Sequence, residues 1–342
     1  MTMKIKWGVI GCGGIADRRT LPGMMLADNA ELVAVMDTNP KAAKACREKY
    51  GARYAFDSVQ ALLALDEIEA VYIASPVFCH REQCALAAKA GKHILLEKPM
   101  GLSVAEAREI ADDCERAGVK LGVAFMMRFH SYHREMRRLV REGLLGEIVS
   151  ARAQFTCWYP EIENCWRQNK ALSGGGAMLD MAIHSIDLIR YITGLEVEES
   201  TGMVGNQIFQ YNVDDAGIGV YRMTGGALVV VDSAFNIPDD VSVSKLEIYG
   251  TKGSMIAKGT LSQVEGGSLE VLAVDNAGGY DAAQNRSLVK PIPISVEFGN
   301  MYTKEIEAFG RAVRGEGEIP VTAADAILSQ KAIEDVYTEN KA

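Results

Sequence analysis

The chain has 342 residues, of which 48% are hydrophobic and 24% charged, with a formal net charge of −9. This length can build two domains, each with its own core, and the composition is that of an ordinary globular protein. The negative charge, without a run of Lys or Arg, argues against a nucleic-acid partner. No apolar run reaches ~18 residues, so no membrane-spanning helix and no membrane partner are expected.

The seven cysteines form no CxxC pair and no His/Cys cluster of zinc-binding spacing, so no metal site is predicted. In a reducing compartment they act as small hydrophobic residues. Cys12 lies in a glycine-rich turn, where a spacer role is favoured over exposure to oxidation. The sequence runs directly into its first strand without a signal-peptide hydrophobic region, which predicts a cytoplasmic protein.

The first part of the chain alternates predicted strands with predicted helices. Apolar runs without polar alternation, such as Ala70–Ala74, are typical of strands that are buried on both faces. This alternation predicts an α/β fold that begins with a doubly wound parallel sheet of the Rossmann type. The predicted strands are 5–10, 31–36, 54–56, 70–74, 93–96 and 120–125, and the helices between them include 39–49, 58–65, 80–90 and 103–117.

A glycine-rich turn of the form GxGxxA follows the first strand. Gly11 allows the sharp turn, Gly13 allows close approach to a pyrophosphate, and Ala16 is small enough for the helix to pack on the sheet. Gly14 and Ile15 lead into this helix, whose free N–H groups and positive partial charge can bind phosphates. The turn therefore predicts a dinucleotide site.

Asp37 ends the second strand, 21 residues beyond Ala16. A carboxylate at this position can accept hydrogen bonds from the adenosine ribose hydroxyls. It would also repel a 2′-phosphate, so the predicted cofactor is NAD, with NADP less favoured.

Two further polar segments follow buried strands, Ser75-Pro76 and Glu97-Lys98. Ligands of open parallel sheets bind outside the carboxyl ends of the strands, so both segments are candidates for the cofactor site. A lysine there needs water or a partner for its charge. An ordinary exposed lysine is the alternative, but the position at the nucleotide edge favours a functional Lys98.

Beyond residue 125 strands dominate, at 148–158, 197–204, 217–223, 227–235 and 242–249, with helices at 133–142, 176–192, 302–314 and 322–337. This pattern predicts an α+β domain with a large, mainly antiparallel open sheet. We therefore expect an NAD-binding domain at 1–125 and a substrate-binding and oligomerisation domain at 126–342, closely packed with a cleft between them.

Asp180, His184 and Asp187 recur at i, i+4 and i+7, on one face of the predicted helix 176–192. The stripe is narrow and its neighbours are mostly apolar, as expected for the wall of a site. His184 can take a hydroxyl proton near neutral pH, while Asp180 orients the imidazole or binds a neighbouring substrate hydroxyl. Lys98 would hydrogen-bond the reacting oxygen. A satisfied polar helix in a domain interface is the alternative.

Four motifs in one chain resemble the Gfo/Idh/MocA oxidoreductase family, whose best-known members act on sugars and polyols. They are the GxGxxA turn, Ala-Gly-Lys-His-Ile-Leu-Leu-Glu-Lys-Pro at 90–99, Gly-Gly-Gly with DxxxHxxD at 174–187, and Gly-Thr-Lys-Gly-Ser at 250–254. The resemblance implies an NAD(P)-dependent enzyme that moves a hydride between the nicotinamide and a secondary alcohol or ketone of a sugar, inositol or polyol. The family's catalytic residues, which also contact substrate, correspond to Lys98, Asp180 and His184; Ala182 replaces the usual glycine of Asp-x-Gly-x-His.

The stretch from His80 to Gln83 and the pair Met301-Tyr302 are similar to the 1,5-anhydrofructose reductase branch of the family. That branch prefers NADP and has no acidic residue at the end of the second strand. Because Asp37 departs from this pattern, neither the substrate nor the cofactor preference of the branch is carried over.

The resemblance also implies a set of supporting residues and an assembly. Arg128, Trp166 and Arg167 would lie near the cofactor, as would His80, and Tyr302 would face the substrate. The alternatives are a core position for Trp166 and a domain-interface ion pair for Arg128. Family members commonly form dimers or tetramers through the open sheet, and an exposed sheet needs covering, so a homodimer or homotetramer is expected.

Two rival classes of function remain. A non-catalytic NAD-binding regulator would be expected to lose Lys98 or His184, and this chain keeps both. A glycoside-cleaving enzyme that uses bound NAD for transient oxidation and elimination remains open. The acidic chain favours a neutral sugar or inositol over a sugar phosphate, but the sequence does not name the substrate.

Overall fold

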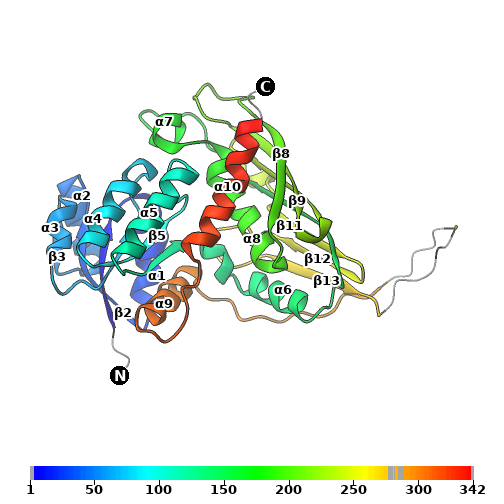
Figure 1. The fold of residues 1–342 in the computed structure, drawn as a ribbon, viewed down its shortest axis with the longest axis horizontal. Helices are drawn as coiled ribbons and strands as arrows, with labels where there is room; N and C mark the ends of the chain where they lie inside the picture. The colour runs from blue at the N-terminus through cyan, green and yellow to red at the C-terminus, as the bar shows by residue number, and fades with distance from the viewer. Residues whose placement is uncertain (1–3, 276–279, 281, 284–288, 340–342) are drawn as a thin grey trace. The chain divides into compact units, whose positions relative to one another are not determined.

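A computed structural model describes residues 4–275, 280, 282–283 and 289–339 (Figure 1). By internal packing the chain divides into two compact units. The first unit contains Met1–Met126, Ile162–Gly176 and Asn300–Lys331, and the second contains Met127–Glu161, Ala177–Gly299 and Ala332–Ala342. Two later segments thus pack with the first part of the chain. The division into an NAD-binding domain at 1–125 and a substrate-binding domain at 126–342 stays a prediction.

The first unit contains a six-stranded sheet of order β3-β2-β1-β4-β5-β6, in which all neighbouring strands are parallel. Its central residues, including Val9, Val33 and Ile73, are completely buried. The predicted Rossmann sheet is confirmed. The strands are β1 (Ile5–Ile10), β2 (Ala30–Met36), β3 (Tyr54–Phe56), β4 (Ala70–Ile73), β5 (His93–Glu97) and β6 (Leu121–Ala124).

Helix ends in this unit follow local capping chemistry. The Asn39 side chain accepts a hydrogen bond from the Lys41 N–H, and the Ser103 hydroxyl accepts one from the Glu106 N–H. The helices are η1 (Ala16–Thr20), α1 (Leu21–Leu26), α2 (Pro40–Tyr50), α3 (Val59–Leu63), η2 (Val77–Cys79), α4 (His80–Lys89), α5 (Val104–Arg116), η4 (Trp166–Gln168), α7 (Lys170–Ser173) and α9 (Met301–Val313).

Helix α9 packs closely against α1. A Cβ atom at Gly23 would lie 2.7 Å from the Cβ atom of Tyr302, so only glycine allows this approach. The Thr303 hydroxyl also donates a 2.8 Å hydrogen bond to the Gly23 carbonyl. This contact directs the inner face of α9 into the first unit.

The second unit contains a seven-stranded sheet of order β13-β12-β11-β7-β10-β9-β8. Strands β7 and β10 are parallel and all other neighbours are antiparallel, which confirms the predicted mainly antiparallel sheet. The sequence did not indicate β12 and β13. The strands are β7 (Ile148–Thr156), β8 (Val197–Gly205), β9 (Ala216–Met223), β10 (Leu228–Ala234), β11 (Lys245–Gly250), β12 (Gly253–Lys258) and β13 (Ser268–Ala273).

Helices cover one face of this sheet. η5 packs on β10, α8 packs on β7, and α6 packs on α8 (Figure 1). Within the described residues, no helix is long and apolar enough to cross a membrane. The remaining helices are η3 (Met126–Phe129), α6 (Ser131–Arg141), η5 (Met178–Ala182), α8 (Ile183–Thr193), η6 (Thr224–Gly226), η7 (Asp239–Val241) and α10 (Ala323–Glu339).

Candidate active site

The glycine-rich turn has the backbone geometry that a dinucleotide site requires. Gly11 has a φ of +93°, and a Cβ atom there would lie 2.9 Å from the backbone of Ala74 and Ser75. A Cβ atom at Gly13 or Gly14 would meet nothing within 4 Å. The space over these residues is open, so a phosphate can approach their backbone closely.

Asp37 lies beside this turn, and backbone N–H groups orient both of its carboxylate oxygens. Oδ2 accepts a 3.0 Å hydrogen bond from the Cys12 N–H, and Oδ1 accepts one of 2.9 Å from the Asn39 N–H. Each oxygen keeps capacity for a further donor, such as a ribose hydroxyl. The turn and this carboxylate together fit the phosphates and ribose of a nicotinamide dinucleotide.

His80 connects the ends of β4 and β5. Its Nε2 lies 3.0 Å from the Ser75 carbonyl oxygen, and its Nδ1 lies 3.1 Å from that of Pro99 and 3.2 Å from that of Met100. Burial lowers the pKa of this imidazole to about 4, although the carbonyls oppose the shift. The ring is 1% exposed and fixes the loop that carries Lys98, while its predicted contact with the cofactor stays a prediction.

Glu97 is the centre of a hydrogen-bonded chain that reaches Lys98. The Tyr72 hydroxyl donates to Glu97 Oε1, and the Lys98 N–H donates a 3.2 Å bond to Oε2. The Thr20 hydroxyl in turn donates a 2.9 Å bond to the Tyr72 oxygen. Burial raises the pKa of Glu97, while Tyr72 and the charges of Lys98 and Arg167 lower it. The backbone before Lys98 is therefore held by side chains from η1 and β4.

Two buried side chains of α9, Tyr302 and Glu305, interact electrostatically with Glu97. Tyr302 is 3% exposed and Glu305 is 1% exposed. Within the described residues, the Tyr302 hydroxyl and both Glu305 carboxyl oxygens lack a hydrogen-bond partner. Burial first, and then the charge of Glu97, raise the pKa of Glu305 well above its ordinary value and raise that of Tyr302. The predicted substrate contact of Tyr302 stays a prediction.

Trp166 and Arg167 lie in η4 of the first unit. The Arg167 guanidinium lies over the Trp166 ring, 4.4 Å from its centroid. The positive charge of Arg167 lowers the pKa of both Glu97 and His80. The predicted Arg167 is therefore within electrostatic range of the strand ends that carry Lys98.

In the second unit, Asp214 fixes the start of the helix that carries Asp180. Its backbone oxygen accepts a 3.0 Å bond from the Ala177 N–H, and its Oδ2 accepts one of 2.9 Å from the Met178 N–H. The Tyr337 hydroxyl donates to Asp214 Oδ1 at 2.7 Å. A carboxylate at a helix N-terminus satisfies free N–H groups and complements the helix dipole.

Asp180 and His184 follow on η5 and α8. Residues Met178–Ala182 form a π-helical turn, a feature that is frequent at functional sites. Asp180 is partly exposed, whereas His184 is 5% exposed and meets the Phe155 ring edge-on at a centroid distance of 6.2 Å. The helix predicted at 176–192 is confirmed, although it begins with this π-helical turn.

Asp187, the third member of the predicted stripe, forms a buried ion pair with Arg128. The Arg128 Nε donates to Oδ2 at 2.8 Å, and its Nη2 donates to Oδ1 at 2.6 Å. Both side chains belong to the second unit, at 7% and 1% exposure. Arg128 is therefore engaged in a bidentate contact, and its predicted role at the cofactor stays a prediction.

The sequence did not point to Tyr72, Asp214 or Glu305. Tyr72 lies within an apolar run and was indistinguishable from a core residue, and the partners of Asp214 come from distant segments. Across the described residues, no group of three or more His, Cys, Asp or Glu side chains could hold a metal ion.

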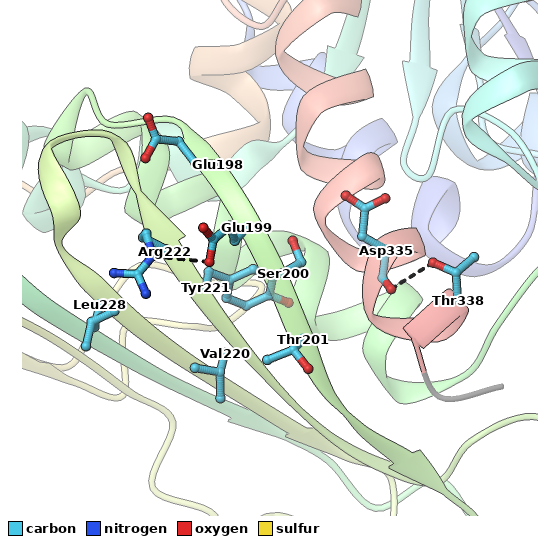
Figure 2. Close-up of a pocket in the computed structure, with 10 residues that line it drawn as sticks. All are labelled: Glu198, Glu199, Ser200, Thr201, Val220, Tyr221, Arg222, Leu228, Asp335 and Thr338. Atoms are coloured by element: carbon cyan, nitrogen blue, oxygen red, sulfur yellow. Dashed lines mark hydrogen bonds and ion pairs between the residues drawn. The ribbon is translucent and has the colours of Figure 1, made fainter. Parts of the chain in front are cut away.

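A separate pocket of about 560 Å³ lies in the second unit between strands β8 and β9 and the end of α10. Figure 2 shows Ser200 and Tyr221 of these strands near Asp335 of the helix. None of the predicted site residues lines this pocket.

Comparison with known proteins agrees with this architecture. A family model described as "Oxidoreductase family, NAD-binding Rossmann fold" matches residues 5–125, and one described as "GFO/IDH/MocA C-terminal domain" matches residues 133–256. The chain is similar to the 1,5-anhydro-D-fructose reductase of Ensifer adhaerens, with 28% identity over 95% of this chain and 92% of the relative.

The chain is also similar to the glucose-6-phosphate 3-dehydrogenase of Bacillus subtilis (strain 168), with 30% identity over 72% of each protein. The solved structure of levoglucosan dehydrogenase in complex with NADH and levoglucosan shares the fold, with a TM-score of 0.86 and 22% identity over 99% of this chain and 97% of that one. Fold and site thus define an oxidoreductase with an NAD(P)-binding Rossmann domain. The chain belongs to the Gfo/Idh/MocA family.

Proposed function

We propose that the protein transfers a hydride between NAD and a secondary alcohol or ketone of a neutral sugar, inositol or related polyol. The observation that carries the proposal is the continuity of the strand ends in the first unit. Gly11 packs against Ser75, the Ser75 carbonyl meets His80, and His80 holds the loop after Lys98. A turn that fits a dinucleotide is thereby connected to a lysine suited to an alcohol oxygen.

We assign the chemical roles as follows. Lys98 hydrogen-bonds the reacting oxygen and stabilises its developing negative charge. His184 takes the hydroxyl proton during oxidation and returns it during reduction. Asp180 orients the imidazole or binds a neighbouring substrate hydroxyl. Bound NAD supplies the hydride acceptor.

We propose NAD rather than NADP because of Asp37. Its carboxylate would accept ribose hydroxyls and repel a 2′-phosphate, and it lies next to the turn. Similar folds occur with either cofactor, as in levoglucosan dehydrogenase with NADH and KijD10 with NADP. The other proposed cofactor contacts are Gly11, Gly13, Gly14, Ile15, Ser75, Pro76, His80, Glu97, Lys98, Arg128, Trp166 and Arg167, and Tyr302 is proposed for the substrate.

The relatives support the substrate class. Their names include a D-glucoside 3-dehydrogenase of Escherichia coli (strain K12) and a myo-inositol 2-dehydrogenase of Thermotoga maritima. We assign residues 1–125 to NAD binding and residues 126–342 to substrate binding and oligomerisation. A cytoplasmic location stays a prediction.

We also propose that the protein is a homodimer or homotetramer built on the uncovered face of the second sheet. Large apolar side chains are exposed there, including Met203 at 78%, Leu228 at 51% and Ile218 at 49%. The register places Met203 opposite Ile218 on neighbouring strands. Light scattering tests this proposal, since a particle with the mass of one chain, 37.1 kDa, would contradict it.

The function is tested with a panel of neutral sugars, inositols and polyols, each offered with NAD or with NADP. We expect NADH to form in proportion to one substrate class, with NAD preferred. Cleavage of a glycoside without net NADH would instead identify the transient-oxidation chemistry. NAD binding without turnover of any substrate would favour a regulator.

A further inference from the structure

The pocket of about 560 Å³ in the second unit lies where β8 and β9 meet the end of α10. A Cβ atom at Gly202 would lie 2.9 Å from the Cγ1 atom of Val336, so this turn of α10 packs directly on β8. Gly202 pairs with Gly219 of β9, and a Cβ atom at Gly219 would lie 2.2 Å from the Tyr221 hydroxyl oxygen. The two glycines therefore make room for the helix and for this hydroxyl group.

Two hydroxyl groups that line the pocket have no hydrogen-bond partner among the described residues. One belongs to Tyr221, which is 1% exposed, and the other to Ser200, which the register places directly opposite Tyr221. Side chains at such positions have Cβ atoms about 5 Å apart. Figure 2 shows both hydroxyl groups on the side of the strands that faces Asp335 of α10. Because a buried hydroxyl group without a partner is costly, this pair is suited to a bound polar group.

The charged groups around these hydroxyls are mainly negative. The carboxylates of Asp335, Glu198 and Glu199 line the pocket. Arg222, the one basic side chain among the described residues that line it, forms a 3.2 Å ion pair with Glu199. The end of α10 adds the partial negative charge of its last carbonyl groups. The pocket therefore favours a cation over a neutral molecule or an anion.

The Asp335 carboxylate acts on the Tyr221 hydroxyl. Burial first, and then the charge of Asp335, raise the pKa of Tyr221 above its ordinary value. The phenol therefore keeps its proton, and its oxygen can accept a hydrogen bond from a donor that lies between it and the carboxylate.

We propose that this pocket binds an alkyl diamine or a longer polyamine, with one primary ammonium group among Ser200, Tyr221 and Asp335. A primary ammonium group has three N–H donors and no acceptor. The pocket offers three acceptors, which are two hydroxyl oxygens and one carboxylate. Glu198 lies two residues along β8 from Ser200, about 7 Å away, where it would attract a second ammonium group on the same carbon chain.

The size of the pocket favours an organic cation over an inorganic one. Its volume falls within the range of about 300–1,000 Å³ that is typical of sites for small organic molecules. A single ion would occupy a small part of this space.

The ammonium site is compatible with the proposed oligomer. Side chains alternate between the two faces of a strand, so Tyr221 points to the opposite face of β9 from the exposed Ile218. An oligomer built on the uncovered face of the sheet would leave the α10 side accessible.

The test titrates the full-length protein with 1,4-diaminobutane by isothermal titration calorimetry. An ionic strength of about 0.15 M screens general attraction to the negatively charged chain. We expect saturable binding of one molecule per chain. Butane-1,4-diol, which has the same carbon chain without charge, should not bind, and exchange of sodium chloride for potassium chloride should not change the Kd.

Two variants remove the proposed contacts. Asp335→Asn should raise the Kd about tenfold or more, because a charged acceptor is lost. Tyr221→Phe should raise it about three- to tenfold, since a neutral hydrogen bond is lost. This second variant removes a hydroxyl group that has no partner among the described residues, so it should fold as well as the original chain, which circular dichroism checks.

A matched control is Glu270→Gln. It removes an exposed carboxylate on β13, at the other edge of the same sheet, and should leave the Kd unchanged. Equal losses of affinity in Glu270→Gln and Asp335→Asn would overturn the proposal, because they would show general attraction to an acidic protein.

Absence of saturable binding, or an unchanged Kd in folded Tyr221→Phe, would also overturn it. A Kd that rises when potassium replaces sodium would identify a metal-ion site in place of the amine site. None of these measurements involves NAD or a sugar, so the outcome is independent of the proposed dehydrogenase function.

Discussion

The two units contain buried carboxyl groups that the fold treats in opposite ways. Asp187 of the second unit is completely buried and accepts two hydrogen bonds from the Arg128 guanidinium. Glu305 of the first unit is equally buried, yet within the described residues no group hydrogen-bonds its carboxyl oxygens. The comparison teaches that the partner, rather than burial, decides whether a buried acid carries charge and whether it stabilises the fold.

The largest effect is expected where the ion pair is broken. Asp187→Asn removes the negative charge and leaves Arg128 buried with its positive charge, so the free energy of unfolding should fall by about 3–5 kcal/mol. Urea unfolding of the purified protein measures the change.

A matched control is Glu199→Gln, which removes the carboxylate of an exposed ion pair with Arg222. It should change stability by about 1 kcal/mol or less, because solvent screens exposed pairs. Equal effects of the two substitutions would show that burial adds nothing to the Arg128–Asp187 pair.

Glu305→Gln should act with the opposite sign. Burial raises the pKa of this carboxyl in the folded protein, so it keeps its proton to a higher pH there than in the unfolded chain, where it ionises above about pH 4.5. The original protein therefore loses stability through Glu305 as the pH rises above that value, by up to about 1.4 kcal/mol per pH unit.

The glutamine variant lacks this dependence, so its stability relative to the original chain should increase between pH 5 and pH 8. Unfolding curves across this range measure the difference. A constant difference, or a loss that grows with pH, would mean that Glu305 is ionised in the folded state and has a partner.

A smaller effect is expected from buried histidines. Burial lowers the pKa of His133 in the second unit to about 3 and that of His80 in the first unit to about 4. In the unfolded chain each imidazole binds a proton as the pH falls below about 6.5, whereas in the folded chain it does so only at a lower pH. The free energy of unfolding should therefore fall as the pH decreases below that value.

His133→Gln tests this interpretation. It loses the hydrogen bonds to Met127 and Thr260 at every pH, but the acid-dependent part of the instability should become less steep. Identical slopes in the variant and the original protein would contradict the assigned neutral imidazole.

Features that neighbouring residues specify were predictable from the sequence. Strands buried on both faces are continuous apolar runs, and the Gly11 turn and the capped helices are specified by neighbouring residues, so the Rossmann sheet was predictable. Lys98 and His184 were found because each lies in a local motif.

The hydrogen bonds that hold the segments carrying Lys98 and Asp180 join residues that are distant in the sequence. Tyr72 meets Glu97 across 25 residues, and Asp214 caps a helix that begins 36 residues earlier. Strands β12 and β13 contain glycine, alanine, serine and charged residues, which have weak strand preferences, so pairing with neighbours decides their structure. The π-helical turn at Met178–Ala182 likewise had no sequence signal.

We propose that the first unit binds the nucleotide while His184 of the second unit moves the proton. The most direct test measures NAD affinity and turnover in one preparation of His184→Ala, with the substrate found in the panel. We predict that turnover falls by about 10²–10⁴-fold while the Kd for NAD is unchanged. An unchanged turnover would contradict this role of His184.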